Sequence, residues 1–434
     1  MDESLKLNEI INHKNALRAL GLILFSSLLL RLIVGVGYVN TMDVYWYRSW
    51  AVDLPNGLFG VYARAEEITL DYPPIYLYFL YPLGLIYKHT GTEIGTFFNM
   101  LIMKFWPIVF DVLCSLLLYI ICKRYGRHIG LFAASAWALN PSTLFNSSMW
   151  GQTDEMMAFL LLLAFWLLEE DRPVASCVAF AVAGLTKYQS LVFTPVLLLE
   201  ILSRYDIKRF FKGIGAAAAT VFSVFLPFMA GARNPLLFFD VYFGGSGKYP
   251  YCTLNAFNVY GIFKLNYSDR ISENINFIGP ISAHSFGVFM VVMVLVLLLL
   301  LYAYHAKTGK PGSPWVACFI IMQWVFMFAT RMHERYQIIV LPFLLMAYIA
   351  HRYKGFLRLY IALTIMTLLN QAYLLFYMNN RNIFYADYYL EGLSAFSFAN
   401  LLLFAWSVVE CIKFYFPQFS VESVMNIFKK PKEA

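Results

Sequence analysis

The segment TRMHERY, residues 330–336, gathers chemistry-bearing side chains between two apolar runs. Charged groups at or near bilayer depth are costly and usually serve a function. If the segment were helical, Arg331 and Arg335 would share a face and could clamp an oxyanion such as phosphate. His333 would lie off that face and still reach the same cavity. The alternatives are an ion pair between Glu334 and Arg331, or an anchor at the membrane interface.

A second stretch, WGQTDE, carries groups that suit a sugar. Trp150 can stack on a pyranose ring, and Gln152 and Asp154 can hydrogen-bond its hydroxyls. The alternative is local, because acidic side chains in the first turn of a helix are stabilised by the positive end of its dipole. The residues alone leave both interpretations open.

Two further stretches place a lysine beside tyrosine. In LTKYQS, Lys187 interrupts apolar sequence, so it either contacts a phosphate or snorkels to the interface. Gln189 follows it and extends a polar pocket. The glycine-rich GGSGKYPY follows no strand and is therefore not a phosphate-binding P-loop. We interpret it as an outer loop, and we expect Lys248 and Tyr249 to contribute to a sugar-binding pocket.

Membrane helices must position these groups. The chain has 434 residues, of which 60% are hydrophobic and 14% charged, whereas soluble domains average about 25% charged residues. Apolar runs such as residues 286–305 are long enough to cross a bilayer and too continuous for the alternating strands of a barrel. Because a spanning segment must satisfy its own backbone hydrogen bonds, we predict an all-α polytopic membrane protein.

The apolar pattern predicts about twelve membrane helices, within a range of about ten to thirteen. Their expected positions are 17–37, 98–121, 128–148, 155–168, 173–185, 189–203, 213–231, 277–304, 316–329, 337–350, 357–377 and 394–414. Together they form one integral-membrane domain over residues 1–434. Residues 38–97 form a long external loop, whose aromatic segments are expected to be interfacial helices. Pro73 and Pro74 suit a helix start there, with Asp71 as its cap.

The distribution of basic residues sets the orientation. Lys and Arg gather in segments such as CKRYGRH (122–128) and RYDIKRFFK (204–212), which the positive-inside rule assigns to the cytoplasm. Both termini are then cytoplasmic, and every polar stretch above falls on the outer face, or in the ER lumen of a eukaryote. Such convergence is typical of an active site. The net charge of +7 therefore indicates topology and no nucleic-acid partner, and six scattered cysteines predict neither disulfides nor a zinc site.

The same stretches, taken in order, resemble a family. After a first helix that contains RL come MDVYWYRSWA (42–51), DYPP (71–74), NPS to WGQTD (140–154) and MHERY (332–336). This order resembles the GT-C superfamily of membrane glycosyltransferases, especially enzymes that depend on dolichyl-phosphate-mannose or dolichyl-phosphate-glucose. The resemblance covers most of the chain. It implies a polyprenyl-phosphate sugar donor, an outward-facing reaction and inversion at the anomeric carbon.

The resemblance also implies residue roles. An acidic residue shortly after the first helix is the family's catalytic base, and Asp43 matches that position. An inverting transfer needs one base for the acceptor's proton, while cations can stabilise the departing lipid phosphate. The basic side chains of 330–336, with Lys187, are the expected cations, and Asp71 and Tyr72 are expected in the sugar or acceptor pocket. The alternative for Asp43 is a helix cap.

The predicted function is transfer of a hexose, mannose or glucose, from a polyprenyl phosphate to a glycan, lipid-linked or protein acceptor of the cell envelope. One alternative is a lipid-linked sugar flippase or secondary transporter, although such proteins usually carry internal repeats and none is visible here. Another is a ligase or polymerase that uses diphosphate-linked glycans. No compact carboxylate cluster stands out, so no metal is predicted, although some GT-C relatives need a divalent cation.

Overall fold

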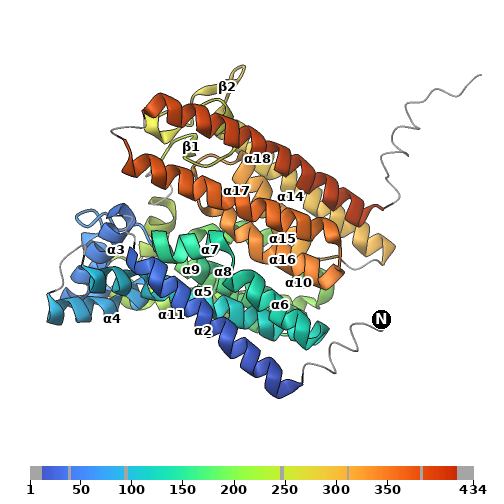
Figure 1. Cartoon of the computed structure of the whole chain (residues 1–434), viewed down its shortest axis with the longest axis horizontal. Coiled ribbons are helices and arrows are strands. Elements are labelled where there is room, and N and C mark those ends of the chain that lie inside the picture. Colours follow the sequence, from blue (N-terminus) through green and yellow to red (C-terminus); the bar gives the residue numbers. More distant parts are fainter. Residues whose placement is uncertain are drawn as a thin grey trace, which may run out of the picture. The chain divides into compact units, whose positions relative to one another are not determined.

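The protein is described by a computed structural model that covers residues 12–37, 41–91, 96–244, 249–309, 312–381 and 385–417 (Figure 1). The structure is 81% helical, and within the described residues six helices are long and apolar enough to cross a membrane. The predicted all-α polytopic membrane fold is therefore confirmed. Each of the twelve expected segments contains a helix, but several are shorter than one span, so the number of crossings stays a prediction.

The chain divides into two compact units. The first comprises residues 1–250, 297–314 and 371–379. Its helices are α2 (His13–Gly37), α3 (Thr41–Asp53), η1 (Leu54–Asn56), η2 (Leu58–Arg64), α4 (Pro74–Thr90), α5 (Phe97–Cys122), η3 (Lys123–Tyr125), α6 (Arg127–Ala138), α7 (Pro141–Leu144), η4 (Phe145–Trp150), α8 (Asp154–Glu169), α9 (Pro173–Thr186), η5 (Tyr188–Phe193), α10 (Thr194–Arg204), α11 (Ile207–Ala232), α12 (Leu237–Phe239) and η6 (Asp240–Gly244).

The second unit comprises residues 251–296, 315–370 and 380–434. Its elements are β1 (Thr253–Leu254), α13 (Val259–Ile262), η8 (Tyr267–Asp269), β2 (Asn276–Ile278), β3 (Ile281–Ser282), α14 (Ala283–Thr308), α15 (Pro314–Phe328), β4 (Met332–His333), η9 (Tyr336–Ile339), α16 (Val340–His351), α17 (Lys354–Asn379) and α18 (Ala386–Tyr415). Helices α14 and α17 contribute residues to both units.

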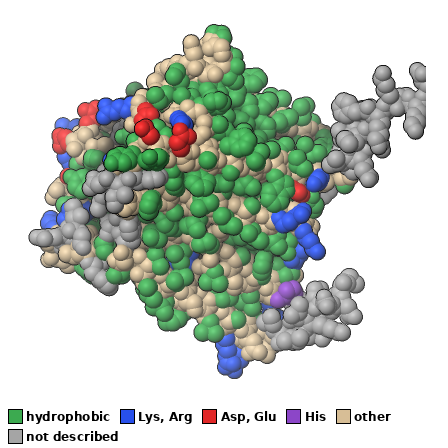
Figure 2. Space-filling model, turned by 45° about the horizontal axis from the view of Figure 1, so that its top comes forward, with side chains coloured by type: hydrophobic (Ala, Val, Ile, Leu, Met, Phe, Trp, Pro, Cys, Tyr) green, Lys and Arg blue, Asp and Glu red, His purple; other side chains and the backbone are tan. Residues whose placement is uncertain are grey.

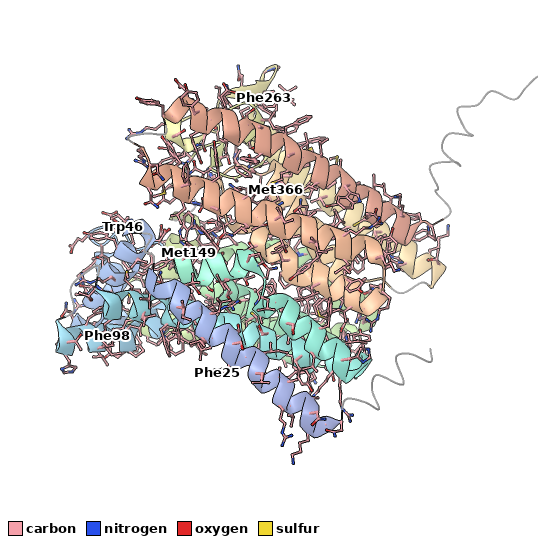
Figure 3. All side chains as sticks on the ribbon, viewed as in Figure 1. Phe25, Trp46, Phe98, Met149, Phe263 and Met366 are labelled. Carbon is pink, nitrogen blue, oxygen red and sulfur yellow. The ribbon has the colours of Figure 1, made fainter. Side chains whose placement is uncertain are left out.

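The outer surfaces of the long helices are apolar, as lipid contact requires. Phe25 of α2 is 64% exposed and Phe98 of α5 is 50% exposed (Figure 3). Hydrophobic side chains dominate the face seen in Figure 2. Exposed apolar surface on this scale marks contact with membrane or protein rather than water.

The segment between α2 and α5 is folded around aromatic side chains. Helix α3 begins at Thr41, and α4 begins at Pro74, as expected. The residue that precedes α4 is Pro73, and no side chain caps the helix, so the prediction that Asp71 is its cap is wrong. Proline already fixes the extended backbone at this start.

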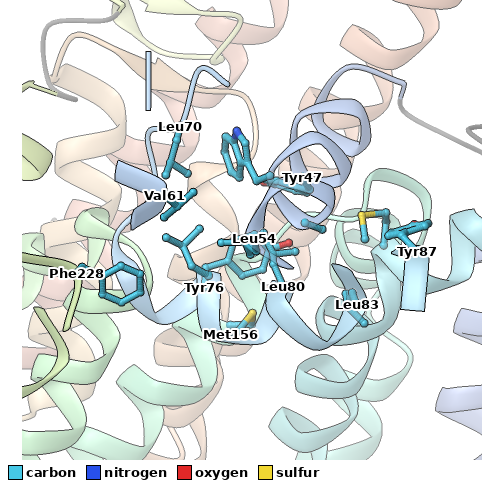
Figure 4. Packing of buried hydrophobic residues seen from close by; sticks show 14 of the residues in the cluster. Tyr47, Leu54, Val61, Leu70, Tyr76, Leu80, Leu83, Tyr87, Met156 and Phe228 are labelled. Carbon is cyan, nitrogen blue, oxygen red and sulfur yellow. The ribbon is translucent and has the colours of Figure 1, made fainter. Parts of the chain in front are cut away.

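Close packing joins helices α3 and α4 of this segment. A Cβ atom at Gly84 of α4 would lie 1.9 Å from the carbonyl oxygen of Ala51 in α3, so only glycine permits this contact. Around it lies a buried cluster that includes Tyr47 of α3, Tyr76 of α4 and Phe228 of α11 (Figure 4). The cluster fixes α3 and therefore the position of Asp43.

In the second unit, buried amides hold the LNAFN stretch, residues 254–258. The Asn370 side chain donates to the carbonyl of Asn255 (2.7 Å) and accepts from the backbone N–H of Phe257 (2.9 Å). Asn400 donates to the Phe257 carbonyl at 2.7 Å. Buried polar groups must find such partners, so the sequence of this motif serves the loop's fixed conformation.

Candidate active site

Asp43 occupies the first turn of α3, where the helix dipole favours a negative charge. Its Oδ2 atom accepts a hydrogen bond of 2.6 Å from the indole N–H of Trp150. The indole is buried, while Asp43 is half-buried. The structure thus joins the expected base to the expected sugar-stacking tryptophan, and the indole holds one carboxylate oxygen in a fixed direction.

The loop that presents Trp150 is shaped by its own sequence. The Asn140 side chain accepts from the backbone N–H groups of Ser142 and Thr143 and so starts α7 at Pro141. The helix then widens into a π-helical turn, Phe145–Trp150, a feature frequent at functional sites.

Glycine ends this π-helical turn. Gly151 has φ of +79°, and a Cβ atom there would meet Lys104 Cγ at 3.1 Å. Both the backbone angle and the close approach of Lys104 therefore favour glycine. Lys104 itself is buried and donates to the carbonyl of Gly35 at the end of α2 (2.9 Å).

Gln152 links this loop to α3 and to the residues before α4. Its Oε1 atom accepts from the Tyr47 hydroxyl at 2.8 Å, and the Tyr47 and Tyr72 hydroxyls lie 2.8 Å apart. The Gln152 Nε2 atom is buried without a hydrogen-bond partner, which makes it a candidate for a ligand hydroxyl. Since Tyr47 is four residues beyond Asp43, both lie on one face of α3.

Asp154 and Lys187 bond each other. The Lys187 ammonium donates to Asp154 Oδ1, and both side chains are nearly fully buried. Asn146 donates to the second Asp154 oxygen and to the Glu155 carboxylate, at 3.3 and 3.0 Å. A charge that is already paired in this way holds a loop in place, so the geometry favours a supporting role for Lys187.

Sequence reasoning missed a second buried ion pair beneath this loop. Arg31 of α2 donates to Asp111 of α5 at 2.5 Å. Asp111 also accepts from the Trp137 indole and the Ser147 hydroxyl, each at 2.7 Å. The pair therefore ties helices α2, α5 and α6 to the π-helical turn. The signal was available, because charged residues within apolar spans are rare and usually serve a function.

The other predicted pocket residues of the first unit come from several segments of the chain. Asp71 and Tyr72 line a cavity of about 600 Å³. Gln189 lies half-buried in η5, two residues beyond Lys187. Tyr249 is 38% exposed, and Lys248 lies outside the described residues.

The 330–336 segment differs from the helical expectation. Met332–His333 form strand β4, which pairs in parallel with β1, and Arg331 has a left-handed φ of +64°. The prediction that Arg331 and Arg335 share a helix face is therefore wrong. A pairing partner 79 residues earlier in the chain overrides the local pattern.

Each arginine of this segment has a carboxylate partner. Arg331 donates through two nitrogens to Glu273, which also accepts from Thr330 at 2.7 Å. Burial alone would raise the pKa of Glu273, but the hydrogen bonds from Arg331 and Thr330 lower it below its usual value. Glu273 is a partner that the sequence did not predict.

Glu334 pairs with Arg335, at 2.7 Å, rather than with Arg331. Burial would raise the pKa of Glu334, but the charge of Arg335 and a hydrogen bond from His333 outweigh it and lower the pKa to about 2. His333 lies 3.5 Å from Arg335 through Nδ1, with its side chain 22% exposed. A carboxylate thus preorganises the guanidinium and imidazole side by side.

No group of three His, Cys, Asp or Glu side chains suited to a metal occurs among the described residues.

Residues 70–243 match glycosyltransferase family 87 in a comparison with protein families. That range contains Asp71, the loop of Trp150 and Lys187, but neither Asp43 nor the 330–336 segment. No curated protein matches the chain. This match, together with the helical, multi-spanning fold, supports the resemblance to membrane glycosyltransferases of the GT-C type.

Proposed function

We propose that the protein transfers a hexose, mannose or glucose, from a polyprenyl-phosphate carrier to a glycan, lipid-linked or protein acceptor on the outer face of the membrane. The observation that carries the proposal is the Asp43 carboxylate, held by the Trp150 indole in the first turn of the helix that follows the first membrane span. This is the place and the residue type that the GT-C resemblance expects of the base.

The proposed chemistry is one inverting displacement. Asp43 accepts the proton of the acceptor hydroxyl as that oxygen attacks the anomeric carbon. The bond from this carbon to the phosphate oxygen breaks, and the lipid phosphate leaves with the electron pair. We assign its stabilisation to Arg331, His333 and Arg335. Lys187 supports the sugar-binding loop through Asp154.

The test compares two aspartates of one helix. Asp43→Asn protein in nanodiscs, given short-chain polyprenyl-phosphate mannose and glucose, should lose roughly 10²- to 10⁴-fold in turnover, the usual contribution of a general base. Asp53→Asn is the matched control, because Asp53 ends the same helix and pairs with Arg64 instead. Near wild-type turnover of Asp43→Asn would remove the base assignment.

The phosphate linker of the donor and the dependence on divalent cations distinguish the possible reaction classes. Donors with one phosphate should be used and donors with a diphosphate linker should not, whereas the reverse result would favour a glycan ligase or polymerase. We also expect turnover to survive a chelator, because cationic side chains can neutralise the phosphate. Loss of activity that Mg²⁺ or Mn²⁺ restores would contradict this expectation.

A further inference from the structure

The cavity beside α4 lies entirely within the first unit and has about 600 Å³ of space, a size typical of ligand sites. Its wall comes from the end of η2 and the turn after it, from the residues before α4, and from α12 and η6. The polar lining residues that matter here are Tyr62, Glu66, Asp71, Tyr72, Asn234 and Asp240.

The charge of this wall is negative. It holds three carboxylates, Glu66, Asp71 and Asp240, and no Lys, Arg or His among the lining residues that the structure describes. Asn234 donates to Asp240 Oδ2 at 2.6 Å and so orients that carboxylate. Ionised carboxylates only accept hydrogen bonds. A ligand with hydroxyl donors fits this wall, and an anionic ligand is repelled by it.

The cavity is linked by hydrogen bonds to the helix that carries the proposed base. The Tyr62 hydroxyl donates to the backbone carbonyl of Tyr72 at 2.7 Å and fixes the rim. The Tyr72 hydroxyl lies 2.8 Å from that of Tyr47. Tyr47 lies four residues beyond Asp43 on α3, a rise of about 6 Å along the helix axis. A hydroxyl-rich molecule beside Tyr72 would therefore be linked through Tyr47 to α3, one helical turn from the proposed proton acceptor.

We infer that this cavity is the acceptor subsite and that it takes an uncharged, hydroxyl-rich glycan rather than a phosphate- or carboxylate-bearing polymer. The inference rests on the proposed transferase function. It assigns acceptor recognition to Glu66 and Asp240, and it gives Asp71, which lines the cavity and does not cap α4, a role in the same recognition.

The experiment uses two matched photoreactive probes, an alkyl glucoside with a diazirine and the corresponding glucuronide, on the full-length protein in nanodiscs. The glucoside should label segments 58–72 or 234–244, and its half-maximal labelling should need a concentration at least about tenfold lower than that of the glucuronide. We expect this difference because repulsion replaces hydrogen bonds to charged groups in the glucuronide. The double variant Glu66→Gln, Asp240→Asn should weaken glucoside labelling about tenfold and narrow the difference between the probes.

Glu67→Gln is the matched control, because Glu67 is an exposed neighbour that does not line the cavity. Absence of glucoside labelling in these segments, equal labelling by both probes, or a double variant that behaves like Glu67→Gln would each overturn the inference. The Asp43→Asn protein separates the two proposals. It should bind the glucoside normally, so its turnover reports on the proposed base, while probe labelling reports on the subsite.

Discussion

The pairing of Asp43 with Trp150 joins residues 107 positions apart in the chain. Each residue type is recognisable in the sequence, and both were expected at the site. Their hydrogen bond was not, because local patterns carry no information on which side chains meet across such a separation. The same limit applies to Arg331, whose partner Glu273 lies 58 positions earlier.

The Trp150 indole offers a prediction on activity. In Trp150→Phe the ring persists but the N–H donor to Asp43 is lost. A hydrogen bond to a charged group contributes about 1.5–3 kcal/mol, so kcat/KM should fall by roughly 10- to 100-fold. Steady-state kinetics in nanodiscs, together with thermal unfolding, provide the measurement.

Trp106→Phe is the control for this prediction. Trp106 donates its indole N–H to the carbonyl of Phe79 at 2.7 Å, and it packs against the buried cluster that includes Tyr47 and Tyr76. It should lose comparable stability and retain kcat/KM. Equal kinetic loss in the two variants would show that Trp150 acts only through packing.

Glu334 predicts a pH dependence of stability. Its pKa in the folded protein is about 2, below the ordinary value of about 4.3. The ionised carboxylate therefore stabilises the fold above the ordinary pKa, and this contribution disappears as the pH falls towards the folded value. The upper limit is about 3 kcal/mol, since one pKa unit corresponds to about 1.4 kcal/mol.

Glu334→Gln checks this pH dependence. The difference in Tm between wild type and variant should be largest near neutral pH and should shrink between about pH 4 and pH 2. Other acids such as Glu273 are present in both proteins, so the difference in Tm reports the contribution of Glu334 alone. A Tm difference that stays constant over this range would exclude a stabilising charge at Glu334.

Among the elements, the apolar helices were predictable and the polar loops were not. A continuous apolar run needs no partner to specify a helix in a membrane. The 330–336 segment needs one, since β4 exists only through its pairing with β1. Likewise, the LNAFN stretch has a role only through Asn370 and Asn400, which lie on helices far away in the sequence.

The π-helical turn before Gly151 carries a prediction at the scale of an element. Gly151→Ala places a Cβ atom at φ of +79° and 3.1 Å from Lys104. A residue with a Cβ atom loses about 1–2 kcal/mol in the left-handed region, and the displaced loop would carry Trp150 and Gln152 with it. We expect lower Tm and lower kcat/KM together, measured on the purified protein.

Gly215→Ala provides the opposite case. Gly215 lies within α11 and has open space around an added Cβ atom, so alanine should raise stability by about 0.5–1 kcal/mol. Activity should not change. If both glycine variants behaved alike, the special backbone at Gly151 would not be the cause of its effect.

At the scale of the whole molecule, hydropathy and the order of motifs were sufficient to predict a membrane glycosyltransferase of the GT-C type. They could not predict the division into two compact units, because that depends on which helices pack together. The orientation in the membrane rests on the distribution of basic residues alone. Orientation is defined only relative to the two faces of a bilayer, and its test must therefore be made in a membrane.

The orientation can be tested with single cysteines. All six native cysteines are buried, so a membrane-impermeant maleimide should give low background in intact cells. The positive-inside rule places Asp269 outside and Lys208 in the cytoplasm, and both side chains are exposed. Asp269→Cys should label in intact cells, and Lys208→Cys only after permeabilisation. The reverse labelling pattern would show the opposite orientation, with Asp43 on the cytoplasmic face. That result would contradict the proposed reaction on the outer face.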